Sequence, residues 1–149
     1  MNNQNILISI HPKHVKNILS GEKIFEYRKT VPKEKISSIV IYSTSPTMKI
    51  VAVSKVTNIH SSTPNEIWNK TKDRSGIEKS FYDSYFTNRD TAYAIELSEV
   101  QTLDNQISLS ELGGSIFPPQ SFQYIDSTLF EKIKHLGNVK SWTRQRLFS

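Results

Sequence analysis

Short stretches of the chain alternate between apolar and polar residues or are rich in β-branched residues. Ile6, Ile8 and Ile10 alternate with Leu7 and Ser9, which predicts a short strand that is largely buried on both faces. The same patterns predict further strands at residues 24–28, 39–43, 50–59 and 92–100, and residues 121–125 alternate again. Turn residues at 44–47 favour an antiparallel pairing of the two strands that flank them.

Helical spacing follows the first strand directly. Val15, Ile18 and Leu19 lie on one helical face, Pro12 suits the first helical position, and Gly21 suits a left-handed end. A second amphipathic helix is predicted near the other end of the chain, marked by Leu129, Ile133 and Leu136 and stopped by Gly137.

Two capping boxes predict short helices in the middle of the chain, one at residues 63–66 and one at residues 75–78. The first helix is expected to begin near Pro64 and the second near Gly76. The second carries four aromatic residues at three- and four-residue spacing, which predicts core or a barrel-capping surface rather than a ligand cage: Phe81, Tyr82, Tyr85 and Phe86.

The order of these elements indicates the fold class. Because crossover helices do not separate the strands one by one, a doubly wound parallel sheet is disfavoured. We expect an α+β fold: a small mixed or antiparallel β-barrel with helices packed at its side and ends.

Composition narrows the class of protein. The chain has 149 residues, 36% of them hydrophobic and 22% charged, which is typical of one globular domain. The absence of cysteine excludes disulfides and thiolate metal sites and favours a reducing compartment. Without an apolar run of membrane-spanning length or a signal-peptide pattern, we expect a cytoplasmic protein that does not enter membranes.

The net charge of +5 is concentrated at one end of the chain. Five basic residues and no acidic residue follow position 131, and Trp142 lies among them. We therefore expect a single domain at residues 1–137 and a basic tail at 138–149. Such a tail either attracts a polyanion such as nucleic acid or is a solvated, frayed end.

The familiar motifs for phosphate, zinc and nucleophile chemistry are absent from the sequence. His11 and His14 lie three residues apart at a helix start, and His60 and His135 are distant in sequence. We expect solvated or cap-proximal histidines, no metal site and no cofactor.

Charged residues are densest at the start of the second strand. With the two-residue period of a strand, Glu26 and Arg28 lie on one face, and Lys23 stands where the preceding helix ends. A carboxylate and a guanidinium held side by side offer matched acceptors and donors to a base edge. The alternative is an ion pair on a half-exposed strand with no function.

The motif Gly21-x-Lys23-x-x-Glu26-x-Arg28 resembles the opening of ASCH domains, which are PUA-like modules. The resemblance continues in order through residues 40–44, 50–52, 91–97 and 118–122, and so covers roughly residues 6–125. It implies a PUA-like β-barrel with a charged cleft that binds RNA, another nucleic acid or a modified nucleoside.

Carried over residue by residue, the resemblance implies a ligand-binding site at Lys23, Glu26, Arg28, Tyr42, Ser43, Gln120, Ser121 and Phe122. For the last five, a structural role is the alternative: Tyr42 and Phe122 as core, Ser43 and Ser121 as turn or cap residues. Phe122 is also a candidate stacking surface for a base.

Enzymes related to this sequence suggest a hydrolase as the alternative function. One branch hydrolyses N4-acetylcytidine with a threonine at the position of Glu26, and a carboxylate cannot replace that nucleophile. As an amidohydrolase, the chain would use Glu26 as a general base on water and Lys23 to stabilise the oxyanion. Another branch is ribonucleolytic. A protein-interaction module is the third alternative, and the oligomeric state is left open.

Overall fold

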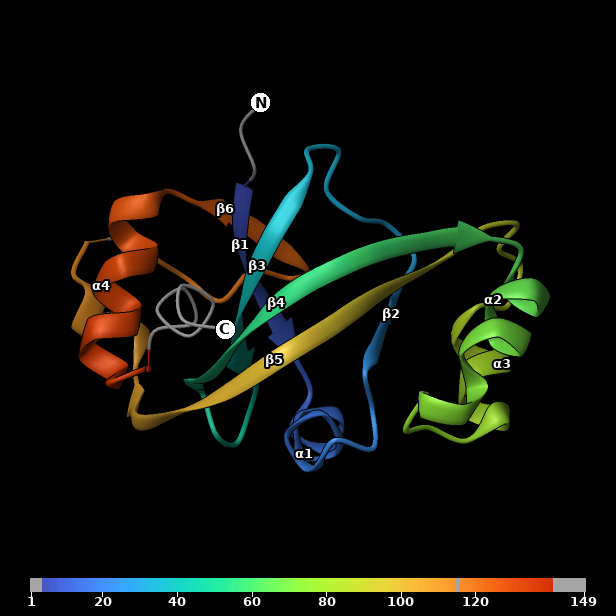
Figure 1. The fold of residues 1–149 in the computed structure, drawn as a ribbon, viewed down its shortest axis with the longest axis horizontal. Coiled ribbons are helices and arrows are strands. Elements are labelled where there is room, and N and C mark those ends of the chain that lie inside the picture. The colour runs from blue at the N-terminus through green and yellow to red at the C-terminus, as the bar shows by residue number, and fades with distance from the viewer. Residues whose placement is uncertain (1–3, 115, 141–149) are drawn as a thin grey trace, which may run out of the picture.

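The computed structural model describes residues 4–114 and 116–140 (Figure 1). It contains six strands, four α-helices and two short 3-10 helices. In chain order they are β1 (Gln4–Ile10), α1 (Pro12–Ser20), β2 (Phe25–Arg28), β3 (Ile36–Ser43), β4 (Lys49–Ser62), α2 (Pro64–Thr71), η1 (Lys72–Arg74), α3 (Lys79–Tyr85), β5 (Ala92–Ile107), η2 (Leu109–Leu112), β6 (Phe122–Ile125) and α4 (Ser127–Gly137).

The strands form one mixed sheet in the order β2-β5-β4-β3-β1-β6. β1 pairs parallel to β3, and the other neighbouring strands pair antiparallel. The α+β class and the mixed sheet are therefore confirmed, although the sheet is not closed into a barrel by backbone pairing. The expected antiparallel pairing of residues 39–43 with the strand after the turn is also confirmed.

The long strands β4 and β5 determine where the helices lie. They cross the molecule from α4 at one end to α2 and α3 at the other (Figure 1). Register shifts interrupt their pairing at three places, and such bulges increase strand twist. One apolar cluster packs beneath α4, a second beside α1, and a third, rich in aromatic residues, beneath α2 and α3.

Local sequence explains the connection between α1 and β2. His11 caps the helix by accepting a hydrogen bond from the backbone N–H of Lys13 at 3.1 Å, and Pro12 occupies the first turn. Gly21 ends the helix with a φ of 88°, the left-handed region that glycine adopts without strain. Only four residues then separate α1 from β2, which brings the two elements to one end of the sheet.

The capping-box predictions have different outcomes. Thr63 caps α2 by accepting from the backbone N–H of Glu66 at 3.2 Å, as predicted. The second box is wrong, because α3 begins at Lys79 and Glu78 occupies its N-cap position. The hydroxyl of Ser75 instead donates to the carbonyl of Ile77, within the loop that precedes α3.

The C-terminal helix α4 confirms the predicted spacing, but Gly137 does not stop it: Gly137 is its last helical residue, and Asn138 takes the left-handed position after it. Asn138 also donates to the Asp104 carboxylate at 2.7 Å. The basic tail predicted at 138–149 lies outside the described residues from position 141 onward. No helix in the described part of the chain is long and apolar enough to span a membrane.

Candidate functional site

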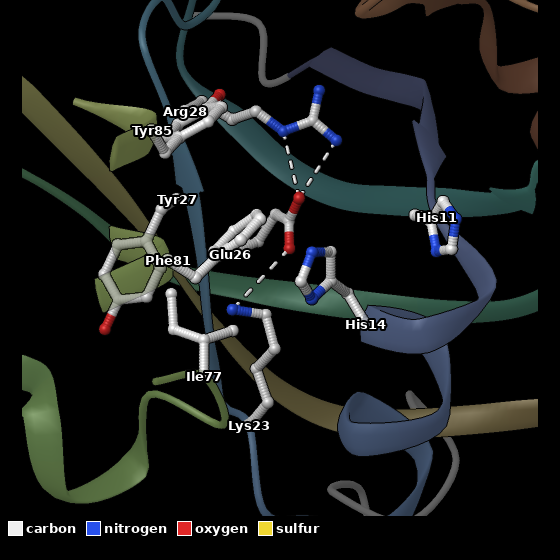
Figure 2. A pocket seen from close by; sticks show the side chains of 9 residues that line it. All are labelled: His11, His14, Lys23, Glu26, Tyr27, Arg28, Ile77, Phe81 and Tyr85. Carbon is white, nitrogen blue, oxygen red and sulfur yellow. Dashed lines mark hydrogen bonds and ion pairs between the residues drawn. The ribbon is translucent and has the colours of Figure 1, made fainter. Parts of the chain in front are cut away.

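A cavity of about 160 Å³ opens at the end of the sheet where α1, β2 and α3 meet (Figure 2). We call it the charged pocket. Three short segments supply its lining. The lining residues are His11 and His14 from the start of α1, Lys23, Glu26, Tyr27 and Arg28 from β2 and the loop before it, and Ile77, Phe81 and Tyr85 from α3 and the loop before it.

Glu26 is at the centre of the charged groups. Its Oε2 accepts from Arg28 Nε at 3.0 Å and lies 3.0 Å from Arg28 Nη2, while its Oε1 lies 3.9 Å from Lys23 Nζ. The Glu26 and Arg28 side chains are only 7% and 12% exposed, and that of Lys23 is 2% exposed. The three groups are therefore a buried cluster and not a surface ion pair.

Arg28 connects strands that are far apart in the sheet. Its Nη2 donates to the backbone carbonyl of Ser9 at 2.6 Å, and its Nη1 donates to the Ser121 hydroxyl at 3.3 Å. β2 forms one edge of the sheet, whereas Ser9 lies on β1 and Ser121 directly precedes β6 at the other edge. The Arg28 side chain thus bridges the curled sheet where backbone pairing does not close it.

Lys23 is held from three sides. Its Nζ donates to the carbonyl of Ser75 at 3.1 Å and lies 4.6 Å from the centroid of the Tyr27 ring. Gly76, with a φ of +66°, packs so closely that an added Cβ would lie 2.4 Å from Lys23 Cβ. Burial lowers the pKa of the Lys23 ammonium, Glu26 opposes this shift, and Arg28 adds to it.

His14 is a site residue that the sequence analysis missed. His11 is cap-proximal as predicted, whereas His14 is half-buried and lines the charged pocket. Its Nδ1 is buried and has no hydrogen-bond partner in the described part of the chain. Its ring contacts Phe81 at a centroid distance of 5.2 Å. The signal in the sequence was its place in the first turn of α1, immediately after a buried strand.

The aromatic stripe of α3 has two different environments. Tyr82 and Phe86 are buried in the third apolar cluster, which confirms the prediction of core for those two. Phe81 and Tyr85 instead line the charged pocket, where sequence reasoning expected no ligand contact. Helical periodicity placed Phe81, Tyr82 and Tyr85 on α3 and Phe86 at its C-cap, but it could not show which of the four rings reach an opening.

The remaining predicted site residues lie apart from the pocket lining. Tyr42 is 3% exposed within the cluster beneath α4, and Ser43 is buried at the end of β3. Gln120 is exposed, and Phe122 packs against the cluster beside α1. Of the residues from the late loop, Ser121 reaches the charged groups, through Arg28. No group of histidine, aspartate and glutamate side chains in the described ranges has metal-binding geometry.

His14 makes the stability of the fold depend on pH. Burial, the largest effect, lowers the pKa of its imidazole from 6.5, and Glu26 opposes the shift. Between the lowered pKa and 6.5 the unfolded chain binds more protons, so the free energy of unfolding rises with pH through that window. His14→Gln should flatten this rise in urea titrations from about pH 5 to 8. Parallel curves for the variant and the wild type would contradict the assignment, since the other histidines are common to both.

Comparisons with known proteins agree with the fold and the motif. The sequence profile of the ASCH domain matches residues 8–101. An ASCH domain-containing ribonuclease of Zymomonas mobilis is 27% identical over 133 residues, which cover 87% of this chain and 90% of that protein. Large ribosomal subunit protein uL22 of Ureaplasma parvum is 31% identical over 123 residues, 82% of this chain. The chain spans only 39% of the length of that ribosomal protein.

Solved structures show the same relationship. The crystal structure of ASCH from Zymomonas mobilis superposes with a TM-score of 0.83 at 26% identity, covering 91% of this chain and 96% of that one. The N-terminal domain of Staphylothermus marinus McrB shares the fold, with a TM-score of 0.58 at 13% identity over 91% and 98% of the two chains. The motif around Glu26, the mixed sheet and the profile match agree: this chain belongs to the ASCH domain family.

Proposed function

We propose that this ASCH domain binds single-stranded RNA and that the charged pocket takes one unstacked base. The observation that carries the proposal is the buried Lys23–Glu26–Arg28 cluster beside an aromatic wall. RNA is favoured over other polyanions because a relative that matches most of this chain is named a ribonuclease.

The charged groups have unused capacity for hydrogen bonds. The 3.9 Å between Glu26 Oε1 and Lys23 Nζ is too long for one, and Oε1 accepts none from any other described residue. Lys23 has three N–H donors, one of which is used on the Ser75 carbonyl. A planar ligand with a donor and an acceptor side by side satisfies both groups, and base edges have that pattern.

The walls and the size of the pocket also fit a base. The lining includes the rings of His14 and Tyr27, and unstacked RNA bases commonly pack on rings of these types. A volume of about 160 Å³ is well below the roughly 300–1,000 Å³ of pockets for drug-sized ligands. The base therefore enters, and the ribose and phosphate stay outside. Buried charges converging on an opening favour this function over a protein-interaction module.

RNA hydrolysis is the second candidate, and His14 is the observation that favours it. Its lowered pKa keeps the imidazole neutral near pH 7, and its buried Nδ1 is unpartnered in the described part of the chain. A neutral imidazole can accept a proton from an attacking hydroxyl group. Hydrolysis of a modified cytidine would use the same pocket with Glu26 and Lys23. Turnover assays with RNA and with a panel of modified nucleosides separate these activities from binding alone.

Lys23→Met tests the binding proposal. The substitution keeps most of the buried volume and leaves Glu26 paired with Arg28, so the melting temperature should change little. RNA affinity, measured by fluorescence anisotropy at low salt, should fall about tenfold or more, because a hydrogen bond to a charged group is worth about 1.5–3 kcal/mol. Preference among homopolymeric strands should shrink as well.

Lys132→Met on α4 is the matched control, because it removes the same charge at the opposite end of the molecule (Figure 1). It should leave base preference unchanged. If the wild-type protein binds no RNA even at low salt, the proposal fails. Binding of free nucleosides in that case would assign the pocket to a small ligand.

A further inference from the structure

Two aromatic rings of α3 lie at the mouth of the charged pocket and are only partly covered by the core. Phe81 is 45% exposed, although large apolar side chains are normally buried. Its ring and that of Tyr85, four residues later, are nearly parallel, with an interplanar angle of 11° and centroids 6.3 Å apart. We call these two rings the aromatic pair.

Contacts from within the protein hold both rings in place. Phe81 packs on the His14 ring, and Tyr85 packs edge-on against the buried ring of Phe86 at 4.8 Å. The aromatic pair is therefore arranged before a ligand arrives, which reduces the conformational entropy lost on binding. Successive bases of a single strand stack on aromatic rings of this kind, which are partly exposed and held in place beside the base pocket.

Charge differs between the two sides of this mouth. On the Tyr85 side, Lys29 Nζ lies 4.7 Å from the centroid of the Tyr85 ring, and no carboxylate in the described ranges pairs with it. Burial raises the pKa of the Tyr85 hydroxyl, and the nearby Arg28 and Arg89 act in the opposite direction. With Lys29, Arg28 and Arg89 nearby, the Tyr85 side of the mouth therefore attracts a phosphate.

The other side of the mouth continues into a groove of about 380 Å³ that shares His14, Ile77 and Phe81 with the charged pocket. Glu22 and Glu78 line this groove, and among the described residues that line it only Lys13 carries an ammonium group. Two carboxylates and one cation repel a phosphate more than they attract it. A nucleic-acid strand that leaves the pocket is thus directed over Tyr85 and away from this groove.

We propose that the aromatic pair stacks the nucleotide next to the one whose base enters the charged pocket, and that Lys29 holds the phosphate between them. The ligand of the site is then a single strand of at least two nucleotides and not a free nucleoside. This inference rests on the proposed RNA-binding function and specifies its substrate class.

The test compares mononucleotides with dinucleotides of each of the four bases, using dinucleotides with a 2′-O-methyl group on the first ribose so that they resist cleavage. The measured quantity is the ratio of dinucleotide to mononucleotide affinity within each protein variant. In the wild type this ratio should lie between about 5-fold and 150-fold, the contribution of one stacked base. Phe81→Ala should reduce it to near one, and Phe81→Trp should preserve it.

Phe117→Ala is the matched control, because Phe117 is a 69% exposed aromatic residue outside the site. It should leave the ratio unchanged. For longer strands, Lys29→Met should reduce the slope of log affinity against log salt by about 0.7, whereas Lys132→Met should not. A 2-aminopurine at the second position should lose fluorescence on binding to the wild type and not on binding to Phe81→Ala.

The outcomes separate the two proposals. If neither mononucleotides nor strands bind, the proposed function itself fails. If mononucleotides bind as tightly as dinucleotides, or if Phe81→Ala keeps the wild-type ratio, the stacking platform is disproved while the base pocket stands.

Discussion

Glu26→Ala should lower the free energy of unfolding by about 3–5 kcal/mol, the cost of leaving buried charges without their partner. The Glu26 carboxylate is 7% exposed and is the counter-ion of both Arg28 and Lys23. Its removal leaves two cations facing each other with little water to screen them. Urea unfolding at neutral pH measures the change directly, and the melting temperature should fall with it.

Asp83→Ala is the control for this prediction. Asp83 pairs with Lys79 on the surface of α3, where the two side chains are 57% and 58% exposed. Breaking an exposed pair of this kind should cost less than about 1 kcal/mol. The double variant Lys23→Met/Glu26→Ala should be more stable than Glu26→Ala alone, because one of the two stranded cations is gone. A Glu26→Ala variant as stable as the wild type would show that the cluster is solvated.

Gly76→Ala should lower the free energy of unfolding more than any other substitution that adds one methyl group near the site. Ala at a φ of +66° costs roughly 1–2 kcal/mol, and overpacking a filled site adds about 1–3 kcal/mol. The new Cβ would lie 2.4 Å from Lys23 Cβ and 3.0 Å from Lys23 Cα, so the backbone of one segment must move. Lys23 would then lose its position against the Ser75 carbonyl, and RNA affinity should fall together with stability.

Gly21→Ala separates backbone strain from collision. Gly21 has a φ of +88°, but an added Cβ there would meet nothing within 4 Å. Its substitution should therefore cost only the strain, roughly 1–2 kcal/mol, and should leave RNA affinity close to that of the wild type. Equal effects of the two substitutions on stability and on binding would show that Gly76 does not position Lys23.

The strand and helix assignments were largely predictable because they depend on local periodicity. The alternation at residues 6–10 and the Pro12–Gly21 boundaries of α1 are confirmed. The failure at residues 75–78 has a tertiary cause. Ser75 has the right residue type for a cap, but its hydroxyl bonds within the loop and its carbonyl accepts from Lys23. A tertiary contact thus replaced the capping box.

By itself, the sequence determined the fold class, the start of β2 as the densest charged cluster, and the shared strand face of Glu26 and Arg28. Periodicity specifies the face of an element on which a side chain lies, and it does so without reference to the rest of the chain. It cannot specify which other element covers that face. The burial of the cluster, the bridge from Arg28 to Ser9 and Ser121, and the place of His14 were therefore decided by the tertiary structure, because each depends on segments far apart in sequence.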